Sequence, residues 1–201
     1  MKFSISDDIK ALAFDLDGTL YDEYDFIKQA YFSVSEIISN NTNINQNNIY
    51  DYLCTLWLIY GSSYNTFQAT FNHFCHQDMN DDLLKKCVSA YRETPFELSL
   101  AKEVIELLDD LDNYPKAIIT DGDSRLQRKK YEALGLKKWI SEDNLFVTGD
   151  YGKENYKPNP YVGELVKDKL CTNKILYFGD RDIDAMFAKN AGFEFIKMNR
   201  R

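Results

Sequence analysis

The sequence predicts an α/β fold, a doubly wound parallel sheet whose first strand is followed by an inserted all-helical segment. Two observations support this. Between residues 95 and 197, short apolar runs of strand length alternate with stretches of helical periodicity, which is typical of βαβ units. Between residues 21 and 94, helical periodicity continues without a clear strand. We therefore expect a core formed by 1–20 and 95–201, and a separate helical domain over 21–94.

The first strand is predicted over 10–17, a run that begins with apolar residues and ends in carboxylates. Apolar residues at helical spacing then predict an amphipathic helix over 22–40. The Asn-rich stretch 40–48 is predicted to be a loop. Further helices are expected near 48–60, 63–77 and 80–93.

In the second half, helices and strands are expected in strict alternation. The helices are expected at 101–111, at 124–134, from about 158–160 onward, and up to 191–192. The strands are expected at 115–120, 145–148, 175–179 and 193–196. Ligands of such sheets bind beyond the carboxyl ends of the strands, so the residues that follow each strand are the candidates for function.

The composition favours a folded protein and disfavours several partners. Of 201 residues, 44% are hydrophobic and 28% are charged, as in ordinary globular chains. The 32 acidic and 24 basic side chains give a net charge of -8, which is unfavourable for binding nucleic acid or an anionic membrane. No apolar run approaches a membrane span of about 20 residues, and no secretory signal is visible, so we expect a cytoplasmic location. The four cysteines lack C-x-x-C spacing and are expected to be buried thiols.

Carboxylates gather at the predicted strand ends. The first strand leads into Asp15-Leu16-Asp17-Gly18-Thr19, where Asp15 and Asp17 share one strand face. One of the two could attack a substrate while the other transfers protons. Asp180 arrives from another strand, and clustered carboxylates repel one another unless a cation joins them. A hard ion such as Mg²⁺, which prefers oxygen ligands, resolves that repulsion.

Two further residues complete the set. Thr120 follows the next core strand and Lys157 precedes Pro158 in a later loop. They offer the hydrogen bond and the positive charge that a phosphoryl group needs. Each feature alone has a plainer interpretation: Asp-Gly-Thr is common turn chemistry, Thr120 suits a strand end or helix cap, and Lys157 suits the surface. Their occurrence together, in order, is what favours a functional site.

These four segments, with Gly179-Asp180-x-x-x-Asp184 as the last, resemble in order and spacing the four motifs of the haloacid dehalogenase-like (HAD) superfamily. The resemblance covers 10–20 and 95–197 and implies a Rossmann-like core. The helical insertion occupies the position of the family's type 1 cap. Aromatic residues of that insertion are expected mainly in its own core: Tyr60, Tyr64, Phe67, Phe71 and Phe74.

The resemblance also implies roles for individual residues. Asp15 would be the nucleophile that forms an aspartyl-phosphate. Asp17 would protonate the leaving group and then activate water, for which we expect its pKa to be raised. Thr120 and Lys157 would hold the phosphoryl oxygens.

The implied cofactor is Mg²⁺, bound by Asp15, Asp180 and the main-chain carbonyl of Asp17. Asp184 is expected outside that ligand set, orienting a metal-bound water or Lys157. Two positions depart from the family pattern, since Asp121 and Arg181 stand where neutral residues are frequent.

The expected activity is therefore that of a Mg²⁺-dependent phosphatase. Its partner would be a small phosphorylated metabolite, either a sugar phosphate or a nucleoside monophosphate, rather than nucleic acid or a membrane. A phosphomutase or a dehalogenase on the same fold remains an alternative. From a different class, so does a phospho-acceptor signalling or binding module.

Overall fold

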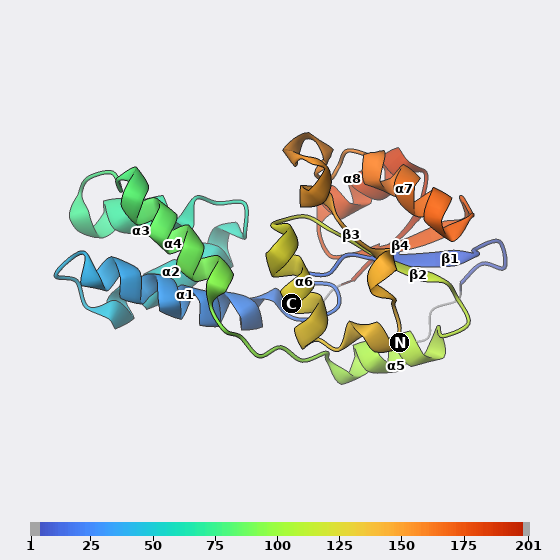
Figure 1. The fold of residues 1–201 in the computed structure, drawn as a ribbon, viewed down its shortest axis with the longest axis horizontal. Coiled ribbons are helices and arrows are strands. Elements are labelled where there is room, and N and C mark those ends of the chain that lie inside the picture. Colours follow the sequence, from blue (N-terminus) through green and yellow to red (C-terminus); the bar gives the residue numbers. More distant parts are fainter. Residues whose placement is uncertain (1–4, 199–201) are drawn as a thin grey trace. The chain divides into compact units, whose positions relative to one another are not determined.

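The computed structural model describes residues 5–198, and within them it contains a five-stranded parallel sheet (Figure 1). The strands are β1 (Ala11–Phe14), β2 (Lys116–Thr120), β3 (Leu145–Val147), β4 (Ile175–Gly179) and β5 (Glu194–Lys197). Their order is β3-β2-β1-β4-β5, and every neighbouring pair is parallel. The chain builds the sheet outward from β1 in one direction and then in the other. The strand order therefore reverses between β1 and β4, where such sheets bind ligands.

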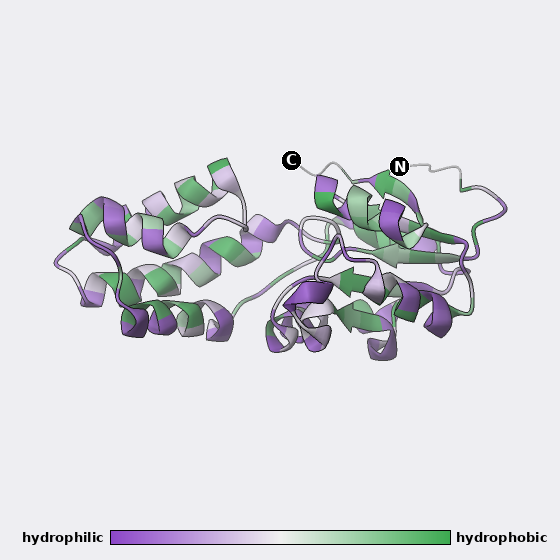
Figure 2. Ribbon diagram, turned by 90° about the horizontal axis from the view of Figure 1, so that it is seen from above, coloured by the Kyte–Doolittle hydropathy of each residue, from purple (hydrophilic) through white to green (hydrophobic). Residues whose placement is uncertain are grey.

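Helices cover both faces of the sheet, which confirms the predicted doubly wound α/β fold. The core helices are α5 (Lys102–Asp110), α6 (Ser124–Ala133), α7 (Tyr161–Leu170) and α8 (Asp182–Ala191). In Figure 1, α7 and α8 lie on one side of the sheet and α5 and α6 on the other. Strands β1, β2 and β4 are buried along their whole length, because parallel strands covered on both faces have no solvent side. Figure 2 accordingly shows the strands as strongly hydrophobic segments.

Between α6 and α7 the chain forms short 3₁₀ turns that the sequence pattern does not predict. They are Leu136–Lys138, Glu142–Asn144, Thr148–Tyr151 and Lys153–Asn155. Turns of three or four residues are too short to show a hydrophobic period. These turns lie in the two connections that lead into and out of β3.

The chain divides into two compact units by its internal contacts. Tyr24–Glu97 forms one of them, here called the helical unit, and the other described residues, 5–23 and 98–198, form the α/β unit. The helical unit contains almost all of α1 (Glu23–Asn40), together with α2 (Gln46–Tyr60), α3 (Thr66–Cys75) and α4 (Asp81–Glu93). The prediction of a loop over 40–48 is wrong at its end, since α2 begins at Gln46. Asn45 caps that helix, because its side chain accepts a 2.9 Å hydrogen bond from the backbone N–H of Asn47.

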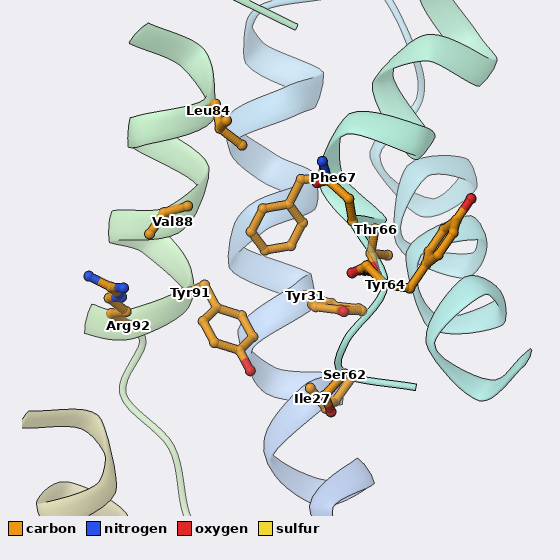
Figure 3. Close-up of a pocket in the computed structure, with 11 residues that line it drawn as sticks. Ile27, Tyr31, Ser62, Tyr64, Thr66, Phe67, Leu84, Val88, Tyr91 and Arg92 are labelled. Atoms are coloured by element: carbon orange, nitrogen blue, oxygen red, sulfur yellow. Dashed lines mark hydrogen bonds between the residues drawn. The ribbon is translucent and has the colours of Figure 1, made fainter. Parts of the chain in front are cut away.

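The interior of the helical unit is aromatic. The rings of Tyr31, Phe67 and Tyr91 contact one another with centroid separations of 5.8 to 6.2 Å. They line a pocket of about 410 Å³ together with Arg92 (Figure 3). The expected aromatic core stripe is divided: Phe71 is buried, whereas Tyr60 and Tyr64 are exposed and Phe67 and Phe74 are half-buried.

The cysteine prediction holds for only two positions. Cys54 and Cys87 are buried, but Cys75 is half-buried and Cys171 is exposed. Cys75 and Cys171 both lie at helix ends. Cys75 is the last residue of α3, and Cys171 is the C-cap of α7, in a left-handed conformation at the surface. Across residues 5–198, no helix is both long and apolar enough to span a membrane.

Candidate active site

Three segments meet around the side chain of Lys157 at the reversal of strand order. Its Nζ lies 2.6 Å from Oδ1 of Asp15, which follows β1, and 2.6 Å from Oδ1 of Asp184 in the first turn of α8. The hydroxyl of Tyr177 in β4 lies 3.1 Å from the same nitrogen. All four side chains are buried. The lysine is therefore not the surface residue that its local sequence alone would favour.

The charges in this cluster do not balance. Burial raises the pKa of Asp15 to about 8; the attraction of Lys157 opposes the shift and repulsion by Asp184 adds to it. Burial also raises the pKa of Asp180. Burial disfavours the charged form of Lys157, but Asp15, Tyr177 and Asp184 together hold the pKa of Lys157 well above its ordinary value. The buried acids exceed the cations that face them, and a bound cation would relieve that excess.

The carboxylates of this cluster fit a metal ion. Oxygens of Asp15, Asp180 and Asp184 lie within 4.8 Å of one another. Oδ2 of Asp15 is buried and has no hydrogen-bond partner, although a buried carboxylate oxygen is costly to leave unpaired. A hard cation such as Mg²⁺ would satisfy that oxygen.

Asp184 differs from the other two carboxylates because both of its oxygens already have partners. Oδ1 accepts the bond from Lys157, and Oδ2 accepts a 3.0 Å bond from the backbone N–H of Arg181. Burial raises the pKa of Asp184, but Lys157 and Arg181 outweigh it and hold the pKa below its usual value. These contacts agree with a role in orienting Lys157.

Gly18 brings the segment after β1 close to Asp180. Its φ is +77°, which L side chains rarely adopt, and a Cβ at this position would lie 2.5 Å from Oδ2 of Asp180. The hydroxyl of the next residue, Thr19, is 3.5 Å from the other oxygen of Asp180. The Asp-Gly-Thr turn thus allows the carboxylates of two strands to approach each other.

Asp17 lies in a different environment from Asp15, and its carboxylate is outside the three-acid group. Lys130 Nζ donates a 2.7 Å bond to its Oδ1, and Gln127 Nε2 donates a 2.7 Å bond to its Oδ2. The hydroxyl of Tyr21 also donates to Oδ1. Burial alone would raise the pKa of Asp17, but the charge of Lys130 and the three hydrogen bonds lower it. The expected rise in this pKa is therefore wrong. The proposed metal contact of Asp17 through its main-chain carbonyl stays a prediction.

Lys130 and Gln127 are the residues that sequence reasoning missed, although a signal was present. The buried positions of α6 are Leu126, Gln127, Lys130 and Tyr131, followed by Leu134. Polar side chains therefore stand at two positions of the stripe that faces the core, where apolar residues are the rule. A buried lysine in such a stripe indicates a buried partner.

Thr120 ends β2, and Asp121 follows it. The hydroxyl of Thr120 is buried and accepts a 2.7 Å bond from Gln127 Nε2. The unusual acid, Asp121, accepts a 2.8 Å bond from the hydroxyl of Thr148 and a 3.1 Å bond from the backbone N–H of Lys157. Asp121 thus joins the loops after β2 and β3 to the lysine segment.

Arg181, the other departure from the family pattern, is the N-cap residue of α8. Its Nε lies 3.8 Å from Oδ2 of Asp184. Burial opposes its charge, but Asp15 and Asp184 raise the pKa of its guanidinium further above its usual value. Arg181 is therefore a second cation among the buried carboxylates.

Comparisons with known proteins agree with this architecture. The family model described as haloacid dehalogenase-like hydrolase matches residues 12–198. A phosphoglycolate phosphatase from Aliivibrio fischeri is 27% identical over 197 residues, covering 92% of this chain and 82% of the relative.

Among solved structures, a subfamily IA, variant 1 hydrolase of the same superfamily from Geobacter sulfurreducens has a TM-score of 0.67 at 19% identity, covering 94% of this chain and 87% of that one. A dehalogenase with an intermediate complex has a TM-score of 0.58 at 20% identity, covering 98% and 88%. At these identities the solved structures establish likeness of fold alone. The family match extends over nearly the whole chain, and the chain therefore belongs to the haloacid dehalogenase-like hydrolases.

Proposed function

We propose that this chain is a Mg²⁺-dependent phosphatase that hydrolyses a small phosphorylated metabolite, a sugar phosphate or a nucleoside monophosphate, through an aspartyl-phosphate. The observation that carries the proposal is the state of Asp15. One of its oxygens is held by Lys157, and the other is buried without a hydrogen-bond partner among acidic side chains. This combination suits a nucleophilic carboxylate that shares a cation with its substrate.

Asp15 and Asp180 would hold the metal ion, with the main-chain carbonyl of Asp17. When bound, the ion would supply positive charge that screens the carboxylates from an approaching phosphoryl group. Thr120 and Lys157 would hold the phosphoryl oxygens, as a hydroxyl donor and a buried ammonium group can.

The reaction would proceed in two displacements. In the first, an oxygen of Asp15 forms a bond to phosphorus, the bond from phosphorus to the leaving oxygen breaks, and that oxygen takes a proton from the fraction of Asp17 that is protonated. In the second, water attacks phosphorus, its proton passes to Asp17, and the bond to Asp15 breaks to release phosphate. The lowered pKa of Asp17 makes its ionised form the resting one, which suits the base of the second step.

Three alternatives are weaker. The curated relative from Aliivibrio fischeri is named a phosphatase, which supports phosphate ester hydrolysis over dehalogenation. A dehalogenase would use Asp15 but would need neither a metal nor the second acid, Asp17. A phosphomutase shares the first displacement and differs in how water is excluded. Membership of this hydrolase family argues against a separate phospho-acceptor signalling module.

Hydrolysis of para-nitrophenyl phosphate, of sugar phosphates and of nucleoside monophosphates tests the proposal. We expect turnover with Mg²⁺ that EDTA abolishes, and its loss in Asp15→Asn. The melting temperature of that variant should not fall, because the substitution removes a buried acid in excess. Turnover that survives chelation or the substitution contradicts the proposal, as does a complete lack of turnover on the whole panel.

A further inference from the structure

The carboxylate of Asp17 is held on both of its oxygens by buried donors. Lys130 and Tyr21 donate to Oδ1, and Gln127 donates to Oδ2. The exposed fractions of Lys130 and Gln127 are 3% and 2%, and Tyr21 is fully buried. All three partners are donors, so the group they hold is an acceptor. With both oxygens engaged, the carboxylate cannot turn about its own axis without breaking a buried hydrogen bond.

Gln127 extends this arrangement to a second strand end. Its Nε2 lies 2.7 Å from the hydroxyl of Thr120 and 2.8 Å from the main-chain oxygen of Asp121, as well as 2.7 Å from Asp17. One amide group therefore links Asp17, beyond β1, to the hydroxyl at the end of β2 that would hold a phosphoryl oxygen. A single buried side chain thus contacts both groups.

We propose that Lys130 and Gln127 are positioning residues, which aim the carboxylate of Asp17 at the water that hydrolyses the aspartyl-phosphate. This inference rests on the proposed function. In that step a bond forms between the water oxygen and phosphorus, and the bond from phosphorus to Asp15 breaks. The water proton goes to Asp17, while Lys130 and Gln127 keep their own protons. A misaimed base costs rate in this step because proton transfer requires close, directional contact.

Burst kinetics on the full-length protein separate this role from a merely structural one. Nitrophenolate leaves without needing a proton, so the first displacement on para-nitrophenyl phosphate does not depend on Asp17. In Lys130→Met we expect kcat to fall about 10- to 100-fold, as for other supporting groups of a site. KM should fall with it, and the burst of nitrophenolate should rise toward one per enzyme. Acid-quenched protein should then carry phosphate on Asp15.

Two further variants sharpen the test. Gln127→Met should also enlarge the burst, so the proposal does not depend on the folding of Lys130→Met alone. Lys130→Arg keeps a charged donor and should recover most of the wild-type kcat. As a matched control, Lys169→Met replaces an exposed lysine of α7 and should leave the burst and kcat unchanged.

The outcomes are distinguishable. Wild-type kinetics in both Lys130→Met and Gln127→Met would overturn the inference while leaving the phosphatase intact. So would a lower kcat without a larger burst, in parallel with a lower melting temperature, because the pair would then only stabilise the fold. Failure of the wild type to hydrolyse any member of the substrate panel with Mg²⁺, or turnover by Asp15→Asn, would instead remove the proposed function and this inference with it.

Discussion

The α/β unit buries charged side chains at its strand ends, whereas the helical unit buries aromatic and aliphatic ones. In the α/β unit, Asp15, Lys157 and Asp184 form one buried cluster and Lys130 pairs with Asp17 nearby. In the helical unit, all of which the structure describes, no charged side chain is buried, and the buried polar residues are serine and threonine. Burying a charge is costly unless it is paired. The contrast indicates that the α/β unit gives up stability at the position where the chemistry is proposed.

Removal of Lys157 should give the largest effect. Lys157→Met leaves two carboxylates facing each other in a buried cluster without their shared cation. We expect the free energy of unfolding to fall by about 3–5 kcal/mol, the range for breaking a buried ion pair. Activity should fall at least about 100- to 1,000-fold, as when a charge-stabilising donor is removed from an active site. Urea denaturation and steady-state kinetics measure the two effects.

The matched control is Lys86→Met in the helical unit. Lys86 pairs with Asp82 at 2.8 Å, but both side chains are more than half exposed. We expect a change within about 0.5 kcal/mol, as for other exposed substitutions. Equal losses of stability in the two variants would contradict the contrast between the units.

The N-caps of α4 and α6 offer a test with a smaller expected effect, because one side-chain capping hydrogen bond can be removed from each unit. Asp123 caps α6 through a 3.1 Å bond to the N–H of Leu126, and Asn80 caps α4 through a 2.9 Å bond to the N–H of Leu83. Replacing either residue by alanine should lower the free energy of unfolding by about 1 kcal/mol. Thermal melting of the two variants measures this loss.

Only Asp123→Ala should also lower kcat, since α6 carries Lys130 and Gln127. Assays of both variants on para-nitrophenyl phosphate separate the two effects. An equal loss of activity in Asn80→Ala would mean that the stability of either unit limits catalysis, and that α6 has no special part in it.

The positions of the motif residues could be predicted because they depend on local sequence. Asp15, Thr120 and Asp180 each follow an apolar run, and the carboxyl ends of parallel strands lie at one edge of a sheet. The environment of Asp17 could not be predicted in the same way. Its pKa depends on Lys130, which is 113 residues away in sequence. The spacing of apolar residues indicates the buried face of α6, but it carries no information on which carboxylate Lys130 meets.

The start of α2 differs from the one that the sequence predicts for a related reason. Composition in the Asn-rich stretch favours a loop, whereas a single capping bond from Asn45 allows the helix to begin two residues earlier than the periodicity indicates. A hydrogen bond between near neighbours in sequence sets the start of α2, whereas residues distant in sequence set the pKa of Asp17. Strand and helix patterning is informative about neither.

Lys116 shows that a buried lysine alone does not mark a site, and it gives the smallest expected effect. It begins β2, at the opposite end of that strand from Thr120, and its Nζ donates a 3.1 Å bond to the main-chain oxygen of Tyr114. Its nearest acid is the exposed Asp112, at 4.0 Å. Burial lowers the pKa of Lys116 below its ordinary value of 10.5, which Asp112 only partly offsets. The folded state therefore binds this proton less tightly than the unfolded state does.

The sign of the resulting pH dependence follows from linkage. Below the folded pKa, both states hold the proton and folding bears the full cost of burying the charge. As the pH rises through the folded pKa toward 10.5, the folded state releases its proton first, so stability increases. Lys116→Met should thus be more stable than the wild type at neutral pH, by about 1 kcal/mol or less, and this advantage should vanish as the pH approaches 10.5. Urea denaturation of both proteins across that range measures it. If the stability advantage of Lys116→Met instead grew with pH, the folded state would stabilise the charged form of Lys116. Lys116 would then not be an uncompensated buried charge of the α/β unit.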